Sequence, residues 1–147
     1  MEFTIPNSLK IEHEELHMHL LKVTKENGKV GPAANRVAEI LHSHFVKEEE
    51  FAAPPLGLLI DLSNGIITQD MKPVLEMTDK LKAELPVILQ EHQLIKDALQ
   101  DLISAAWSDS KLEYVDFANK LILHAQTEEE VLYPAAILIG EFLKLKL

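Results

Sequence analysis

Two stretches of the sequence carry the same polar residues at the same spacing. In LHSHFVKEEEFAAPP (residues 41 to 55) and LILHAQTEEEVLYPA (residues 121 to 135), a histidine precedes the first of three glutamates by four positions and a proline by ten. Residues four positions apart lie on one face of an α-helix, so each stretch can present an imidazole and a carboxylate to the same point. Nitrogen and oxygen donors of this kind bind first-row transition metal ions. The repeated pattern therefore predicts a metal site to which both stretches contribute.

The elements that position these residues are predicted to be helices, with no sheet. Period-two alternation is rare, whereas apolar residues recur at steps of three and four, as in amphipathic helices. Asn27 and Gly28 are expected to end the first helix, and Ser110 with Glu113 has the spacing of a capping box. Pro86 is expected to kink or offset the third helix. The predicted helices span residues 8 to 27, 32 to 52, 70 to 106 and 110 to 133, the last continuing past Pro134, with a long connection at residues 54 to 69.

Each predicted helix has an apolar seam that one histidine interrupts. In the second and fourth helices, a glutamate one turn after the histidine also lies on the seam. The seams are Leu9, His13, Leu16, Leu20 and Val23; Val37, Leu41, His44, Glu48 and Phe51; Leu85, Ile88, His92, Ile95, Leu99 and Leu102; and Phe117, Leu121, His124, Glu128 and Val131. Six polar side chains therefore point where a leucine is expected.

The four seam histidines are expected to lie in one layer of the molecule. In an antiparallel helical hairpin, residues equally far from the turn lie side by side, and each histidine is nearly the same distance from its turn. The second half of the chain also repeats the pattern of the first, because EHQLI at residues 91 to 95 resembles EHEEL at residues 12 to 16. The sequence thus predicts two similar helical hairpins within a single domain of residues 1 to 147.

A metal centre is the best explanation for this polar layer. Buried imidazoles and carboxylates are unfavourable unless they are hydrogen-bonded, paired or coordinated, and a divalent or trivalent cation would satisfy all six together. The chain has no cysteine, so any metal must be held by nitrogen and oxygen. Such a set suits iron, with zinc or manganese as alternatives. Because carboxylates can bridge two ions, the pattern favours a dinuclear centre.

The arrangement of these motifs resembles the hemerythrin-like family of HHE cation-binding proteins. The resemblance covers nearly the whole chain, as His, His-x-x-x-Glu, His and His-x-x-x-Glu in order, with EEEVLYP after the last histidine. It implies an all-α, up-and-down antiparallel four-helix bundle around a non-haem di-iron site that binds dioxygen or related small ligands. Carried over by position, Glu48 and Glu128 would bridge the two ions. The implied ligands are His13, His44, Glu48, His92, His124 and Glu128.

The sequence departs from the oxygen-carrying hemerythrins on the third helix. Those proteins place two histidines one turn apart there, whereas Ile88 and Lys96 occupy the positions four before and four after His92. The missing fifth histidine argues against reversible oxygen carriage. The remaining candidates for ligands are His17, Glu49 and Glu129.

Three further polar side chains are assigned other roles. His19 and His42 fall off their seams and are predicted to face solvent. Tyr133 is predicted to be an ordinary half-buried tyrosine, the alternative being a hydrogen-bond donor to a ligand carboxylate.

Composition excludes several classes of partner. With 14 basic and 24 acidic residues, the formal net charge of −10 would repel a nucleic acid backbone. No secretion signal is apparent and no apolar run is long enough to cross a membrane, so a cytoplasmic protein is expected. The oligomeric state is left open by the sequence.

Three functions remain, and the leading one is a di-iron protein that binds or senses dioxygen, nitric oxide or iron. The second is a di-iron or di-manganese oxidase or peroxidase, although ferritin-like enzymes of that kind use Glu-x-x-His motifs and more carboxylates. The third is a helical bundle with a purely structural metal. Whether the protein is an enzyme is therefore left undecided by the sequence.

Overall fold

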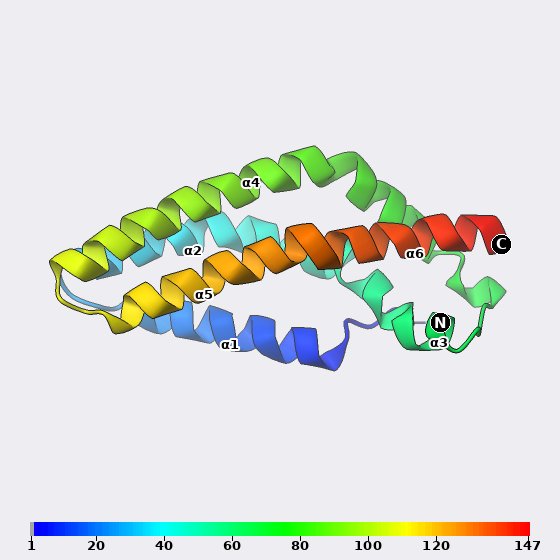
Figure 1. The fold of residues 1–147 in the computed structure, drawn as a ribbon, viewed down its shortest axis with the longest axis horizontal. Helices are drawn as coiled ribbons and strands as arrows, with labels where there is room; N and C mark the ends of the chain where they lie inside the picture. Colours follow the sequence, from blue (N-terminus) through cyan, green and yellow to red (C-terminus); the bar gives the residue numbers. More distant parts are fainter. Residues whose placement is uncertain (1) are drawn as a thin grey trace.

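The computed structural model describes residues 2–147, and the described chain is helical with no strand. Four long helices are α1 (Asn7–Val23), α2 (Val30–Lys47), α4 (Val74–Ser108) and α5 (Glu113–Thr127), and α6 (Tyr133–Lys146) extends the last of them (Figure 1). The shorter elements are the π-helical turns η1 (Glu48–Ala52) and η4 (Glu128–Leu132), the 3₁₀ turns η2 (Pro54–Leu58) and η3 (Gln69–Met71), and the short helix α3 (Leu59–Ser63).

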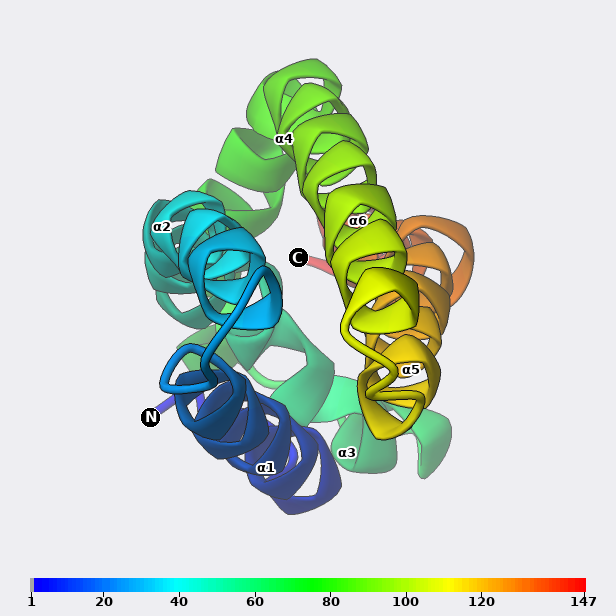
Figure 2. The same cartoon turned by 90° about the vertical axis from the view of Figure 1, so that its left-hand side faces the viewer.

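The long helices pack around a common interior, as Figure 2 shows in an end view. Helix α4 contacts α2, α5 and α6, and α1 contacts α2. In Figure 1 the α1–α2 turn and the α4–α5 turn lie at one end of the molecule, and both chain termini lie toward the other. The predicted all-helical class and the packing of four helices are confirmed. Among the described residues, no helix is long and apolar enough to cross a membrane.

The turn at residues 24–29 is held in place by hydrogen bonds to Asp109, in the second half of the chain. The carboxylate of Asp109 accepts hydrogen bonds from the backbone N–H groups of Lys29 (2.8 Å) and Val30 (3.1 Å) at the start of α2. Gly28 has a φ of 76°, and a Cβ there would lie 2.7 Å from the Asp109 carboxylate, so both conformation and space require glycine. This turn begins after Val23, so the first helix was predicted to end four residues too late.

The capping box predicted at the start of the fourth helix does not form. Helix α5 begins at Glu113, and no side chain caps its N-terminus. Ser110 instead adopts a left-handed conformation with a φ of 58°, and the N–H of Lys111 donates to the carbonyl of Ala106. This is the geometry that ends a preceding helix, so Ser110 terminates α4 rather than starting α5.

Three prolines coincide with a bend, a connection and a helix start in the chain path, namely Pro86, Pro54 and Pro134. Helix α4 runs through Pro86 without a break, and Figure 1 shows it bending in the half that contains this residue. The predicted long connection begins at Pro54 and contains the short elements η2, α3 and η3. Helix continues past Pro134, as predicted, because the proline sits in the first turn of α6.

The apolar core is divided into two clusters, one on each side of the predicted polar layer. The cluster nearer the two turns contains residues such as Leu20, Leu102 and Phe117. The other contains Ile88 and Phe51, among further residues of η1, α4 and α6. The seam residues on either side of His13, of His92 and of the pair His44 and Glu48 belong to opposite clusters, so these polar residues lie between two apolar blocks.

Candidate metal centre

The structure brings all six predicted ligands together in that layer. Single histidines come from α1, α2, α4 and α5, and the two glutamates are the first residues of the π-helical turns η1 and η4. Five of the six are buried, and His13 is partly buried. The residues are His13, His44, Glu48, His92, His124 and Glu128.

Their donor atoms form two groups that share Glu128. In the first, hereafter the His44–His92 group, the donor atoms of His44, Glu48, His92 and Glu128 all lie within 4.8 Å of one another. The Nε2 atoms of His44 and His92 are 2.8 Å apart, and Nε2 of His44 is 3.1 Å from Oε1 of Glu48. In the second, hereafter the His13–His124 group, the two Nε2 atoms are 3.0 Å apart.

Both carboxylates present one oxygen to each group. Oε1 of Glu128 is 3.4 Å from Nε2 of His92, whereas Oε2 is 3.4 Å from His124 and 3.5 Å from His13. Glu48 has the same relation, with Oε1 near His44 and Oε2 3.6 Å from Nε2 of His13. A carboxylate that turns its two oxygens toward two different sets of nitrogen donors has the geometry of a bridging ligand.

Two histidines are oriented by carboxylates on their outer ring nitrogens. Nδ1 of His92 is 2.9 Å from Oε1 of Glu129, whose two oxygens also accept hydrogen bonds from Lys96. Nδ1 of His124 pairs with Glu12. Such partners fix the ring so that Nε2 faces the centre, an arrangement common around metal-binding histidines. Glu129, a spare ligand candidate from the sequence, thus lies behind His92 rather than among the facing donors.

The other candidate ligands stay outside the centre. His17 and Glu49 are exposed and belong to neither group, and His19 and His42 are exposed as predicted. Two contributors were missed from the sequence, Glu12 and Lys96. A signal existed for both, since Glu12 directly precedes His13 and Lys96 is one helical turn after His92.

Tyr133 lies deeper than predicted. Its side chain is 2 % exposed, and its hydroxyl donates to Oε1 of Glu48. The hydroxyl oxygen of Tyr133 is also 3.1 Å from Nε2 of His92 and 3.2 Å from Nε2 of His44. Val131, predicted on the seam, is 56 % exposed. The π-helical turn explains both errors, because it adds a residue to one turn and so shifts every later side chain around the helix axis.

In the metal-free centre, protonated histidines balance the negative charge of the buried carboxylate of Glu128. Burial alone would lower the pKa of His13 and of His92, but hydrogen bonds and charge attraction to Glu128 raise both. Burial and the charge of Glu128 raise the pKa of Glu48. Burial would also raise the pKa of Glu128, yet its hydrogen bonds to Glu48 and the histidines hold it well below its usual range. In the absence of metal, positive imidazoles therefore compensate the buried carboxylate.

The metal-free protein is accordingly expected to lose stability as the pH rises from 6.5 to about 9. Burial opposes protonation of His124, but Glu128 and Glu12 raise its pKa from 6.5 to about 9. A raised pKa contributes stability that is fully present below 6.5 and is lost as the pH rises through the folded-state value. Thermal melts of chelator-treated protein across this range should show a falling midpoint, and a flat profile would contradict the assignment.

The donor set fits a metal ion in one further respect. Oε2 of Glu48 is buried without any hydrogen-bond partner among the described residues. Buried polar atoms without partners are rare and often mark the position of an ion or water. For Glu48 the atom concerned is the oxygen that faces the second histidine group, so an ion held there would satisfy it.

Comparison with known proteins adds no relative to this picture. No family model and no curated protein matches the sequence, and no solved structure gives a significant match. The functional interpretation therefore depends on the geometry of the centre.

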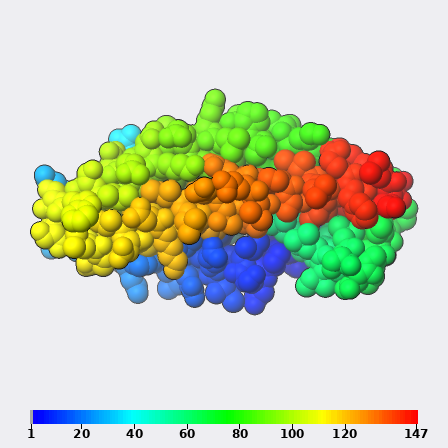
Figure 3. Space-filling model, viewed as in Figure 1, coloured from blue at the N-terminus to red at the C-terminus, as the bar shows by residue number. Residues whose placement is uncertain are grey.

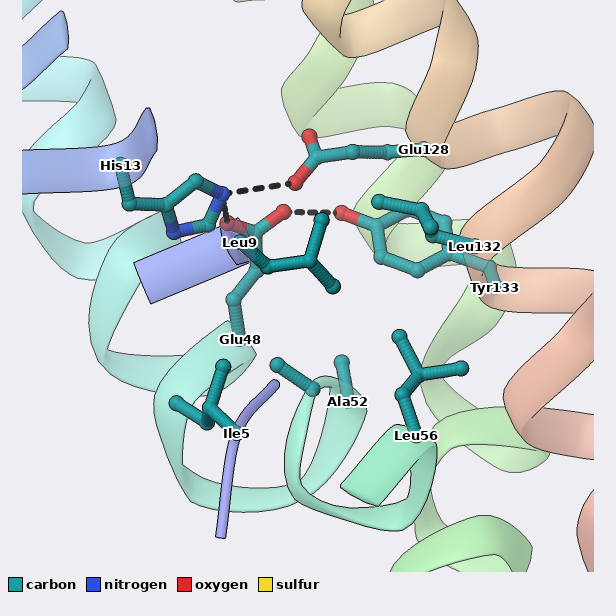
Figure 4. A pocket seen from close by; sticks show the side chains of 10 residues that line it. Ile5, Leu9, His13, Glu48, Ala52, Leu56, Glu128, Leu132 and Tyr133 are labelled. Carbon is teal, nitrogen blue, oxygen red and sulfur yellow. Dashed lines mark hydrogen bonds and ion pairs between the residues drawn. The ribbon is translucent and has the colours of Figure 1, made fainter. Parts of the chain in front are cut away.

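A small apolar cavity reaches the centre from one side. Its polar lining is His13, Glu48, Glu128 and Tyr133, and the rest is aliphatic, as Figure 4 shows. Its volume of about 20 Å³ is close to what one water-sized molecule needs. The cavity lies where α1, the connection after η1 and the start of α6 come together, and Figure 3 shows these segments meeting on one face of the molecule. The aliphatic lining residues are Ile5, Leu9, Ala52, Ala53, Leu56 and Leu132.

Proposed function

We propose that this protein is a hemerythrin-like, non-haem di-iron protein that binds or senses dioxygen, nitric oxide or iron. Its two similar hairpins would form an up-and-down antiparallel bundle around the centre. The observation that carries the proposal is the placement of Glu48 and Glu128, each with one oxygen toward each histidine group. Two adjacent sets of donors that share both carboxylates are suited to two ions, not to one.

Iron is the favoured metal for this donor set. Four imidazoles and two carboxylates, with no thiolate in the chain, suit iron, and zinc and manganese are the alternatives. Bound iron would supply reversible one-electron chemistry and affinity for small diatomic ligands. The protein would hold the carboxylates between the two histidine groups and orient His92 and His124 through their outer partners.

The cavity favours small-ligand binding over a purely structural metal. It touches both bridging carboxylates and His13, so a ligand entering it would reach the centre directly. Its aliphatic walls would exclude bulk water, and its volume would admit a diatomic molecule but not a larger organic substrate. A structural ion would instead be expected to lie in a fully closed donor set.

The proposal is tested by metal analysis of protein purified without added metal or an affinity tag. About two irons per chain are expected, together with a spectral change when azide or nitric oxide is added. One zinc ion per chain with no response to azide would support a structural role and contradict the proposal. Repeated consumption of hydrogen peroxide per iron would instead indicate an oxidase or peroxidase.

A further inference from the structure

One matched position carries very different side chains in the two halves of the centre. When His44 is aligned with His124, Glu48 aligns with Glu128 and Pro54 with Pro134. The residue before each proline is Ala53 in the first half and Tyr133 in the second. Each follows a π-helical turn, and both line the cavity. The two halves of the site therefore carry a phenol on one side and only a methyl group on the other.

The phenol oxygen of Tyr133 lies among the donors of the His44–His92 group. It is 3.1 Å and 3.2 Å from the two histidine Nε2 atoms, which are themselves 2.8 Å apart, and it contacts Oε1 of Glu48. Two ligands bound at right angles about 2.1 Å from one ion lie about 3 Å apart. The hydroxyl is thus spaced from the histidines as a further ligand would be. A hydrogen-bond donor that served only Glu48 would not need to approach both imidazole nitrogens.

The geometry points to Tyr133 as a phenolate ligand of the ion held by the His44–His92 group, with no equivalent at the ion held by the His13–His124 group. This inference rests on the proposed iron centre and adds to it the identity of a ligand. By the matched positions, Ala53 belongs to the His13–His124 side. Because alanine offers no donor there, the second ion keeps an open position beside the cavity, where an external ligand can bind.

Coordination by Tyr133 involves proton transfer and no electron transfer. The phenol O–H bond breaks, an oxygen–iron bond forms, and the proton leaves to solvent, as expected when a metal ion displaces protons from its ligands. A third anionic oxygen near this ion, beside Glu48 and Glu128, favours the higher ferric charge. The tyrosine therefore works against reversible oxygen carriage, in agreement with the missing fifth histidine.

The test compares two tyrosine variants of the iron-loaded protein. The chain has two tyrosines, and the other one, Tyr114, lies in the first turn of α5, at the turn end of the molecule. Its hydroxyl donates to Glu26, which also accepts a hydrogen bond from Lys111. Ferric wild-type protein and Tyr114→Phe should both show a visible phenolate-to-iron charge-transfer band, and resonance Raman spectra excited in it should show phenolate ring vibrations. Tyr133→Phe should lose the band and the vibrations while it retains its iron.

The outcomes separate this inference from the proposed function. If wild-type protein binds about two irons without phenolate vibrations, or if Tyr133→Phe retains them, the tyrosine is not a ligand but the iron centre stands. If no iron binds after anaerobic reconstitution, the proposed function and the inference both fail. Iron content measured on each sample, with helicity by circular dichroism, shows whether a lost band reflects lost coordination or lost folding.

Discussion

Replacing Glu128 by glutamine is expected to empty the metal centre. Glu128 turns one oxygen toward His92 and the other toward His13 and His124, so the substitution weakens both sites together. The amide removes a negative charge and leaves only one good acceptor oxygen, which cannot serve both groups. His13, His92 and His124 would each lose the carboxylate that faces them. We expect iron to fall from about two to well below one per chain after reconstitution.

The matched control is Glu130→Gln, in the same π-helical turn. Glu130 is exposed, and its side chain accepts a hydrogen bond from the side chain of Gln126. Its variant should retain iron at the wild-type level, which excludes a general effect of altering the turn. Metal analysis after anaerobic reconstitution, with circular dichroism to verify helicity, decides the result. Full iron content in Glu128→Gln would show that the carboxylate does not bridge two ions.

The sequence was sufficient to find the polar layer because buried polar residues stand out on an apolar seam. His44, His92 and Glu48 occupy positions where the steps of three and four demand leucine, and each is at most 2 % exposed. The same periodicity gave the four long helices and the exposure of His19 and His42. These features depend on local spacing, which the sequence contains directly.

The sequence-based predictions were wrong where the spacing of nearby residues does not determine the structure. The α-helical period of 3.6 residues does not predict a π-helical turn. Val131 was therefore predicted to lie on the apolar seam, and Tyr133 was predicted to be only half-buried. The start of α2 is capped by Asp109, which is about 80 positions away and invisible to local motifs. Glu129 was left as a candidate for a further ligand because its position in the sequence does not reveal which nitrogen of His92 it approaches.

Metal-free protein should become more stable when Glu48 is replaced by methionine. Glu48 is 2 % exposed, its Oε2 has no hydrogen-bond partner, and burial with the charge of Glu128 raises its pKa. Methionine has a similar length and adapts to irregular cores. The hydroxyl of Tyr133 keeps Nε2 of His44, at 3.2 Å, as an acceptor. Because the raised pKa favours the neutral carboxyl, methionine leaves no buried charge unpaired and removes a polar atom without a partner, which costs about 1 to 3 kcal/mol.

The same substitution should abolish the dinuclear centre. A variant that is more stable without metal but no longer binds two ions would identify Glu48 as a functional residue. Urea unfolding of metal-free protein measures the gain, and metal analysis measures the loss. Glu50→Met, at an exposed position of the same turn, should leave the iron content unchanged and alter the free energy of unfolding by less than about 0.5 kcal/mol. If Glu48 served folding, Glu48→Met would give the reverse result, a less stable protein that still binds its iron. A carboxylate that serves metal binding lowers the stability of the metal-free protein, and the binding of the ions restores that stability.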